Sequence, residues 1–235
     1  MGASAKRSRS RKPKQGVLPF RNWGGPRKGS GRKPKNGTCA GVSHRQRAAL
    51  ASKHPAHVTL KLRSHLPRLR QKAEYAALRA AFVKGKDRFG FRLCHYAVLN
   101  DHLHLICEAA DRAALRRGLQ GLAIRIARAL NKLWSRKGKV FADRYHDRVL
   151  TSPREVRNAV AYVMGNARHH AAAGRMVRAP QPIDTYSSAP WFDGFRASVR
   201  VRGLEAITRP TTPARTWLLD TGWRRHGLIP IAATA

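Results

Sequence analysis

The chain has 235 residues, and its 48 Lys and Arg against 12 Asp and Glu give a formal net charge of +36. A surplus of this size repels itself unless a polyanion neutralises it, and nucleic acid does so with release of counterions. An anionic membrane is disfavoured as the partner because no long apolar run or basic amphipathic anchor occurs. The 42% of hydrophobic residues exclude a wholly disordered chain, and three widely spaced cysteines without a Cys-x-x-Cys pair argue against a zinc ribbon or a disulfide framework. We therefore expect an intracellular protein that binds nucleic acid.

The first part of the chain has the composition of a basic arm. No acidic residue precedes Glu74, and the first forty or so residues combine basic residues with Gly and Pro. Such a segment cannot bury enough apolar surface to fold alone, so we expect residues 1–52 to be a disordered DNA-binding arm. Its segment 26–35 loosely resembles an AT-hook, which lies in the minor groove, although a plain polybasic tail is the favoured alternative. The candidate DNA contacts in the arm are Arg27, Lys28, Arg32 and Lys33.

Residues 53–172 carry the periodicities of a folded domain. The predicted elements are a strand at 57–62, a helix from Pro67 to about Gly85, strands at 89–99 and 102–108 joined by a tight turn at Asn100-Asp101, a helix capped by Asp111 that ends near Trp134, an extended segment at 140–150, and a helix from Ser152-Pro153 to about His170. This order predicts an α+β fold, a ferredoxin-like split β-α-β antiparallel sheet with helices on one face and an additional C-terminal helix. Residues 173–235 are Pro-rich and predicted to be an irregular extension with no assigned function.

The segment from Asn100 to Leu105 is the most informative of the chain. Successive side chains of a strand point to opposite faces, so His102 and His104 share one face while Leu103 faces a core. Two imidazoles side by side on a strand can form half of a divalent metal site. A histidine pair alone is weak evidence, because such residues often only satisfy local hydrogen bonds.

The last predicted helix carries Tyr162 and Asn166, which are four residues apart and therefore project from one side. A tyrosine hydroxyl can form a covalent intermediate when a metal polarises a phosphorus centre, and an amide oxygen is a ligand suited to Mg²⁺ or Mn²⁺. Taken alone, Tyr162 is more often a half-buried core aromatic than a nucleophile. The two residues complete a metal site only if this helix packs near the histidine strand.

These residues resemble those of the HUH nucleases. The pair His102-Leu103-His104, followed by Tyr162 and Asn166 on a later helix, is similar to the single-tyrosine transposase branch and most similar to the REP-associated tyrosine transposases. The aromatic and basic segment 140–148 also looks like the run that precedes the family's tyrosine helix. The resemblance covers roughly residues 54–170, and it departs from the family after Asn166, where Pro-Val-Arg is common and this chain continues Ala-Arg-His.

The resemblance implies a DNA transposase. Tyr162 would attack a phosphate in single-stranded or hairpin DNA and become linked to its 5′ side, with Mg²⁺ or Mn²⁺ held by His102, His104 and Asn166. Arg144 and Arg148 would contact the DNA, and the protein would act in the bacterial cytoplasm on the nucleoid, as a monomer or a homodimer. Two alternatives remain open, a catalytically inactive nucleic-acid-binding protein of the same fold and a metallonuclease that uses water.

Overall fold

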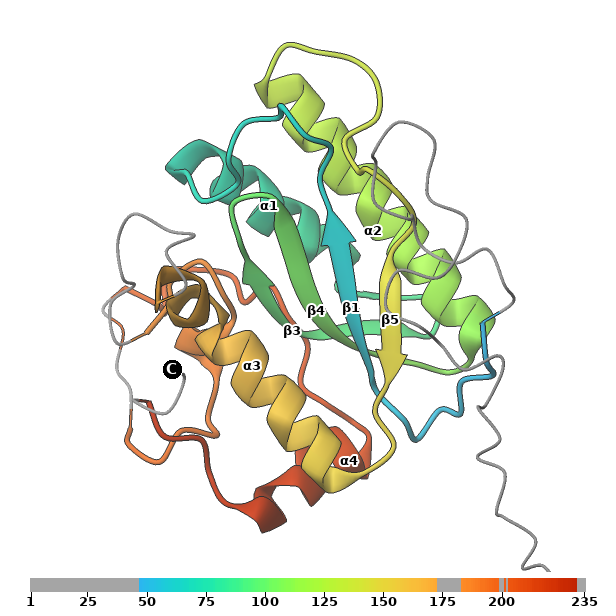
Figure 1. Cartoon of the computed structure of the whole chain (residues 1–235), viewed down its shortest axis with the longest axis vertical. Helices are drawn as coiled ribbons and strands as arrows, with labels where there is room; N and C mark the ends of the chain where they lie inside the picture. The colour runs from blue at the N-terminus through green and yellow to red at the C-terminus, as the bar shows by residue number, and fades with distance from the viewer. Residues whose placement is uncertain (1–46, 173–182, 199–200, 202, 232–235) are drawn as a thin grey trace, which may run out of the picture. The chain divides into compact units, whose positions relative to one another are not determined.

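A five-stranded antiparallel sheet with strand order β2-β3-β4-β1-β5 lies at the centre of the computed structural model (Figure 1). The structure describes residues 47–172, 183–198, 201 and 203–231, without the side chains of 167–172. The strands are β1 Ala56–Lys61, β2 Asp87–Arg88, β3 Phe91–Val98, β4 His102–Ala109 and β5 His146–Val149. The helices are α1 Lys72–Gly85, α2 Arg112–Leu133, α3 Pro153–Ala172 and the short α4 Trp217–Asp220, with 3₁₀ turns η2 Ala189–Trp191 and η3 Gly222–His226. The predicted α+β class and antiparallel sheet are confirmed.

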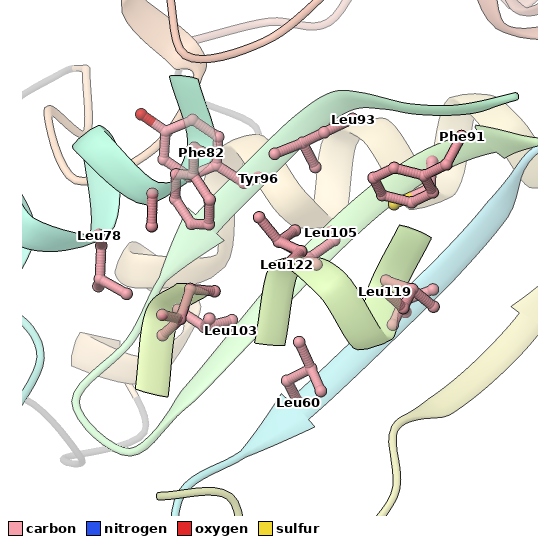
Figure 2. Close-up of a cluster of buried hydrophobic side chains, with 14 of the residues drawn as sticks. Leu60, Leu78, Phe82, Phe91, Leu93, Tyr96, Leu103, Leu105, Leu119 and Leu122 are labelled. Atoms are coloured by element: carbon pink, nitrogen blue, oxygen red, sulfur yellow. The ribbon is translucent and has the colours of Figure 1, made fainter. Parts of the chain in front are cut away.

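Helices α1 and α2 cover one face of the sheet and form the larger core with it (Figure 2). Alternate residues of β4, Leu103 and Leu105, are fully buried there, as the period of two in a strand requires. Helix α2 contributes an apolar stripe that includes Leu119 and Leu122, and Asp111 caps it by accepting a hydrogen bond from the Ala114 N–H at 2.6 Å. Each fully buried Leu contributes about 1.5–3 kcal/mol relative to an exposed one. This core fixes the strands that carry the histidines.

Helix α3 lies on the opposite face of the sheet (Figure 1), where it forms a second buried cluster. Val156, Val160 and Val163 of α3 belong to this cluster together with Ile106 of β4. Ser152 and Glu155 cap the helix reciprocally, because Ser152 Oγ accepts from the Glu155 N–H at 3.3 Å and Glu155 Oε2 accepts from the Ser152 N–H at 3.3 Å. The tyrosine-bearing helix therefore packs against the sheet.

The segment 183–231 adds to the cover of this second face. The Ser188 N–H donates to Tyr96 O at 2.9 Å, and the Thr212 N–H donates to Leu93 O at 2.9 Å. The buried Glu108 carboxylate of β4 accepts hydrogen bonds from the backbone N–H groups of Arg215 and Thr216 at 2.9 and 2.8 Å. A carboxylate that receives several N–H groups is an anchor that ties this segment to the sheet.

Two predicted boundaries are wrong. Helix α1 begins at Lys72 rather than Pro67, because the preceding residues are held outside helical geometry: the Leu69 N–H donates to Asn100 O at 2.9 Å and Arg70 forms an ion pair with Asp184 at 2.8 Å. The strand predicted over 89–99 begins at Phe91, because Phe89 and Gly90 have φ values of +53° and +77° and turn the chain between β2 and β3.

The extended segment predicted at 140–150 is a strand only over β5, His146–Val149, with an isolated bridge between Leu62 and Phe141 before it. The free cysteines Cys94 and Cys107 are buried in the sheet. Among the helices that the structure describes, none combines the length and the apolar character that a membrane crossing needs.

Candidate active site

The histidine pair lies on β4, a central strand, on the face that α3 covers. The ring centroids of His102 and His104 are 4.9 Å apart, while the intervening Leu103 points into the opposite core. In the register with β1, Lys61 lies opposite His102 and Thr59 opposite His104. The predicted sharing of one face by the two histidines is confirmed.

Each imidazole is oriented through its Nδ1 atom. Nδ1 of His102 lies 2.7 Å from Oδ1 of Asp101, and this hydrogen bond is the main reason why the pKa of Asp101 is lowered. Nδ1 of His104 lies 3.1 Å from Nε2 of His57 and 3.2 Å from Oγ1 of Thr59. Because both Nδ1 atoms are engaged, a metal ion would bind at the Nε2 atoms, and the groups on Nδ1 would hold the rings in place.

Tyr162 of α3 lies beside these rings. Its ring centroid is 5.1 Å from that of His104 and 5.9 Å from that of His57, both in edge-on geometry. Tyr162 is 40% exposed, so a ligand can reach it. The sequence could not establish that α3 reaches the histidine strand, and the structure places the phenol against it.

Asn166 is fully buried one helical turn after Tyr162. Within the described part of the chain, neither Oδ1 nor Nδ2 of Asn166 has a hydrogen-bond partner. A buried amide without partners costs about 1–3 kcal/mol, so its retention calls for an explanation. An amide oxygen is a ligand suited to a divalent ion such as Mg²⁺ or Mn²⁺. Among the described residues, no group of three His, Cys, Asp or Glu side chains is arranged to hold a metal ion.

An open groove of about 350 Å³ runs along Tyr162. Its polar lining comes from β1, β5 and α3 and comprises His57, Arg148, Glu155, Asn158 and Tyr162. Arg148 is exposed and forms an ion pair with Glu155 at 2.8 Å. The pKa of Glu155 is lowered to about 2, first by the hydrogen bond from the Thr151 N–H and then by Arg148. A groove with a guanidinium beside a phenol can receive a phosphate.

The other predicted DNA contacts do not line this groove. Arg144 is exposed on the loop before β5 and is not among the groove-lining residues. The arm residues Arg27, Lys28, Arg32 and Lys33 lie outside the described residues, and the domain boundaries at 52 and 172 stay predictions. Leu50, inside the predicted arm, is buried in the larger core.

His57 is the site residue that the sequence analysis missed. Burial is the first cause that lowers its pKa to about 4, and the charges of His146 and Arg148 add to the effect, so the ring is neutral at pH 7. A neutral ring can accept a hydrogen bond from Nδ1 of His104. The signal in the sequence was the alternation His57-Val58-Thr59, which repeats that of His102 and His104, but only the strand register brings the two pairs together.

No protein-family model matches the chain, and neither does any curated protein. Among solved structures, it is similar to a REP-associated tyrosine transposase bound to a REP hairpin, at 17% identity over 63% of this chain and 82% of that one, with a TM-score of 0.48. It is also similar to a transposase candidate from Deinococcus radiodurans r1, at 14% identity over 58% of this chain and 98% of that one, with a TM-score of 0.36. Identities and TM-scores of this size describe a likeness of fold, so the assignment of the site rests on its own residues.

Proposed function

We propose that the protein is a DNA transposase that cuts and rejoins single-stranded or hairpin DNA through a covalent 5′-phosphotyrosine intermediate at Tyr162. The observation that carries the proposal is the position of this exposed phenol, edge-on to His104 at the rim of a groove that also holds Arg148. On this proposal, Tyr162 is the nucleophile, His102 and His104 are metal ligands, and Arg148 binds a phosphate of the DNA.

In the proposed step, the Oη atom of Tyr162 attacks the scissile phosphorus and the bond from phosphorus to the 3′ oxygen breaks. The phenolic proton passes to solvent, and the leaving 3′ oxygen takes up a proton to become a free 3′-OH. His102, His104 and Asn166 would hold the Mg²⁺ or Mn²⁺ ion, whose charge polarises the phosphate. Because the phosphodiester energy is retained in the tyrosine ester, attack by another 3′-OH rejoins a strand without ATP.

The charge of the chain supports DNA as the partner. A net charge of +36 favours binding to a polyanion through counterion release, and Arg148 brings part of that charge to the groove. The solved transposase with a similar fold was bound to a REP hairpin, and a DNA hairpin with single-stranded flanks is therefore our test substrate.

The test is covalent capture. The protein is incubated with the hairpin and Mn²⁺, and a denaturing gel is used to detect a protein–DNA adduct. A fluorophore at the 3′ end of the oligonucleotide should travel with the protein, whereas one at the 5′ end should not. Tyr162→Phe should abolish the adduct without unfolding the protein, and Tyr145→Phe is the matched control that should retain it.

Four other outcomes would contradict the proposal. An adduct that survives Tyr162→Phe, or one that carries the 5′ label, would assign the chemistry to another group. Cleavage without a covalent species would favour the water-using metallonuclease. DNA binding with neither cleavage nor adduct over many hairpin sequences would favour the inactive binding protein.

A further inference from the structure

The tip of the β2–β3 hairpin carries an exposed aromatic side chain in a conformation that disfavours it. Phe89 is 73% exposed, which makes it the most exposed of the large hydrophobic residues that the structure describes. Its φ is +53° and that of Gly90 is +77°, as in the two-residue hairpin turns that favour Asn-Gly or Asp-Gly. A bulky residue with a positive φ is a conformational outlier, and such outliers gather at functional sites.

The backbone of the hairpin tip is held by an ion pair and by hydrogen bonds. Asp87 and Arg92, opposite each other in the register, form an ion pair at 2.7 Å. The Leu93 N–H donates to Lys86 O at 2.7 Å, and the Ala110 N–H donates to Gly90 O at 2.9 Å. These bonds hold the tip on both sides, so the exposed ring is presented in a fixed place.

The chemistry around the ring selects its partner. The guanidinium carbon of Arg88 lies 5.6 Å from the centroid of the Phe89 ring. An exposed aromatic side chain next to a cation is an arrangement by which proteins stack on an unpaired base while binding the adjoining phosphate. Aromatic and apolar side chains also enter base steps as wedges. The net charge of +36 favours a polyanion over a protein as the partner.

We propose that Phe89 stacks on an unpaired base of the DNA and that Arg88 binds the adjoining phosphate, at a contact separate from the tyrosine site. The inference rests on the proposed function only in taking DNA as the partner. In this proposal, Phe89 provides a contact to unpaired bases in addition to the contacts in the groove beside Tyr162.

The test compares full-length Phe89→Asn and wild-type protein by fluorescence anisotropy on a hairpin with unpaired flanks and on a fully paired duplex. Asn adopts positive φ readily, so the variant should keep its thermal midpoint, and Phe89→Gly is a second variant compatible with the turn. The Kd for the DNA with unpaired bases should rise about tenfold, because one stacking contact is lost, while the Kd for the duplex stays within about twofold. Phe89→Tyr should bind as the wild type does.

Ile124→Gln is the matched control, since Ile124 is an exposed apolar residue of α2 outside the hairpin and its replacement should leave both Kd values unchanged. Unchanged affinity of Phe89→Asn for unpaired DNA, or an equal loss on the duplex, would overturn the inference. The adduct assay separates it from the proposed function. If no Tyr162 adduct forms but Phe89→Asn binds unpaired DNA tenfold more weakly, the stacking contact is supported and the proposed function is not. If the adduct forms but Phe89→Asn binds as the wild type does, the proposed function is supported and the stacking contact is not.

Discussion

Replacing Asn166 by Leu should stabilise the metal-free protein and remove its response to metal. Leu has the same branched arrangement of side-chain heavy atoms and introduces no polar group, whereas the buried amide of Asn166 lacks partners among the described residues. Removal of an unsatisfied buried amide is worth about 1–3 kcal/mol. For a protein of this size, each kcal/mol shifts the thermal midpoint by about 2–4 °C, so we expect a rise of roughly 2–12 °C in EDTA.

Added metal should reverse this order. Mn²⁺ at a hundred times its Kd would stabilise the wild type by about 2.7 kcal/mol, because it binds the folded state alone. Asn166→Leu should show little of this gain, since it lacks the amide ligand. The assay is scanning calorimetry of both proteins in EDTA and across a Mn²⁺ titration, with Asn158→Leu as a control on the exposed side of the same helix. A lower midpoint for Asn166→Leu in EDTA, or a metal-induced rise equal to that of the wild type, would refute the role of the amide.

Two further predictions concern stability. Gly118→Ala should lower the thermal midpoint by an amount equivalent to about 1–3 kcal/mol, because the added Cβ would lie 2.1 Å from Cγ of Phe91. The control Gly121→Ala on the same helix meets only the end of the flexible Arg125 side chain and should gain up to about 1 kcal/mol of stability. Equal midpoints in the two variants would contradict this packing. Because the pKa of His57 is lowered in the folded protein, the unfolded chain binds more protons than the folded one between pH 6.5 and about 4. The contribution of His57 to the free energy of unfolding should therefore be fully present above pH 6.5 and decrease as the pH drops through this range. In EDTA, the midpoint of His57→Gln should fall less steeply over the same range, and identical slopes would show that another group is responsible.

The local geometry of the histidine pair could be predicted because it depends on the period of a strand alone. Alternation placed His102 and His104 on one face of the sheet and the apolar Leu103 on the other, and the structure buries both Leu103 and His104. The helix start at Ser152 was equally accessible, since capping depends on neighbours in sequence. The resemblance to a known family supplied the roles of the residues, and those roles stay predictions.

The rest of the site depends on contacts between distant parts of the chain. His57 reaches His104 only through the β1–β4 register, which a single chain of alternating residues does not specify. The start of α1 was missed for a related reason, because Leu69 and Arg70 are held by bonds to residues 31 and 114 positions further along the chain. Phe89 was assigned to a strand because an aromatic residue favours one, and the following Gly90 was the available signal for the turn.

Tyr162 and the histidines lie on opposite sides of the packing interface between α3 and the sheet, and this links the proposed activity to complete folding. A newly made or partly folded chain already carries its full positive charge and can adhere to DNA. On the proposed mechanism, the phenol and the imidazoles meet only when α3 has packed on the second face of the sheet. An incompletely folded chain would therefore be able to bind DNA without being able to cleave it.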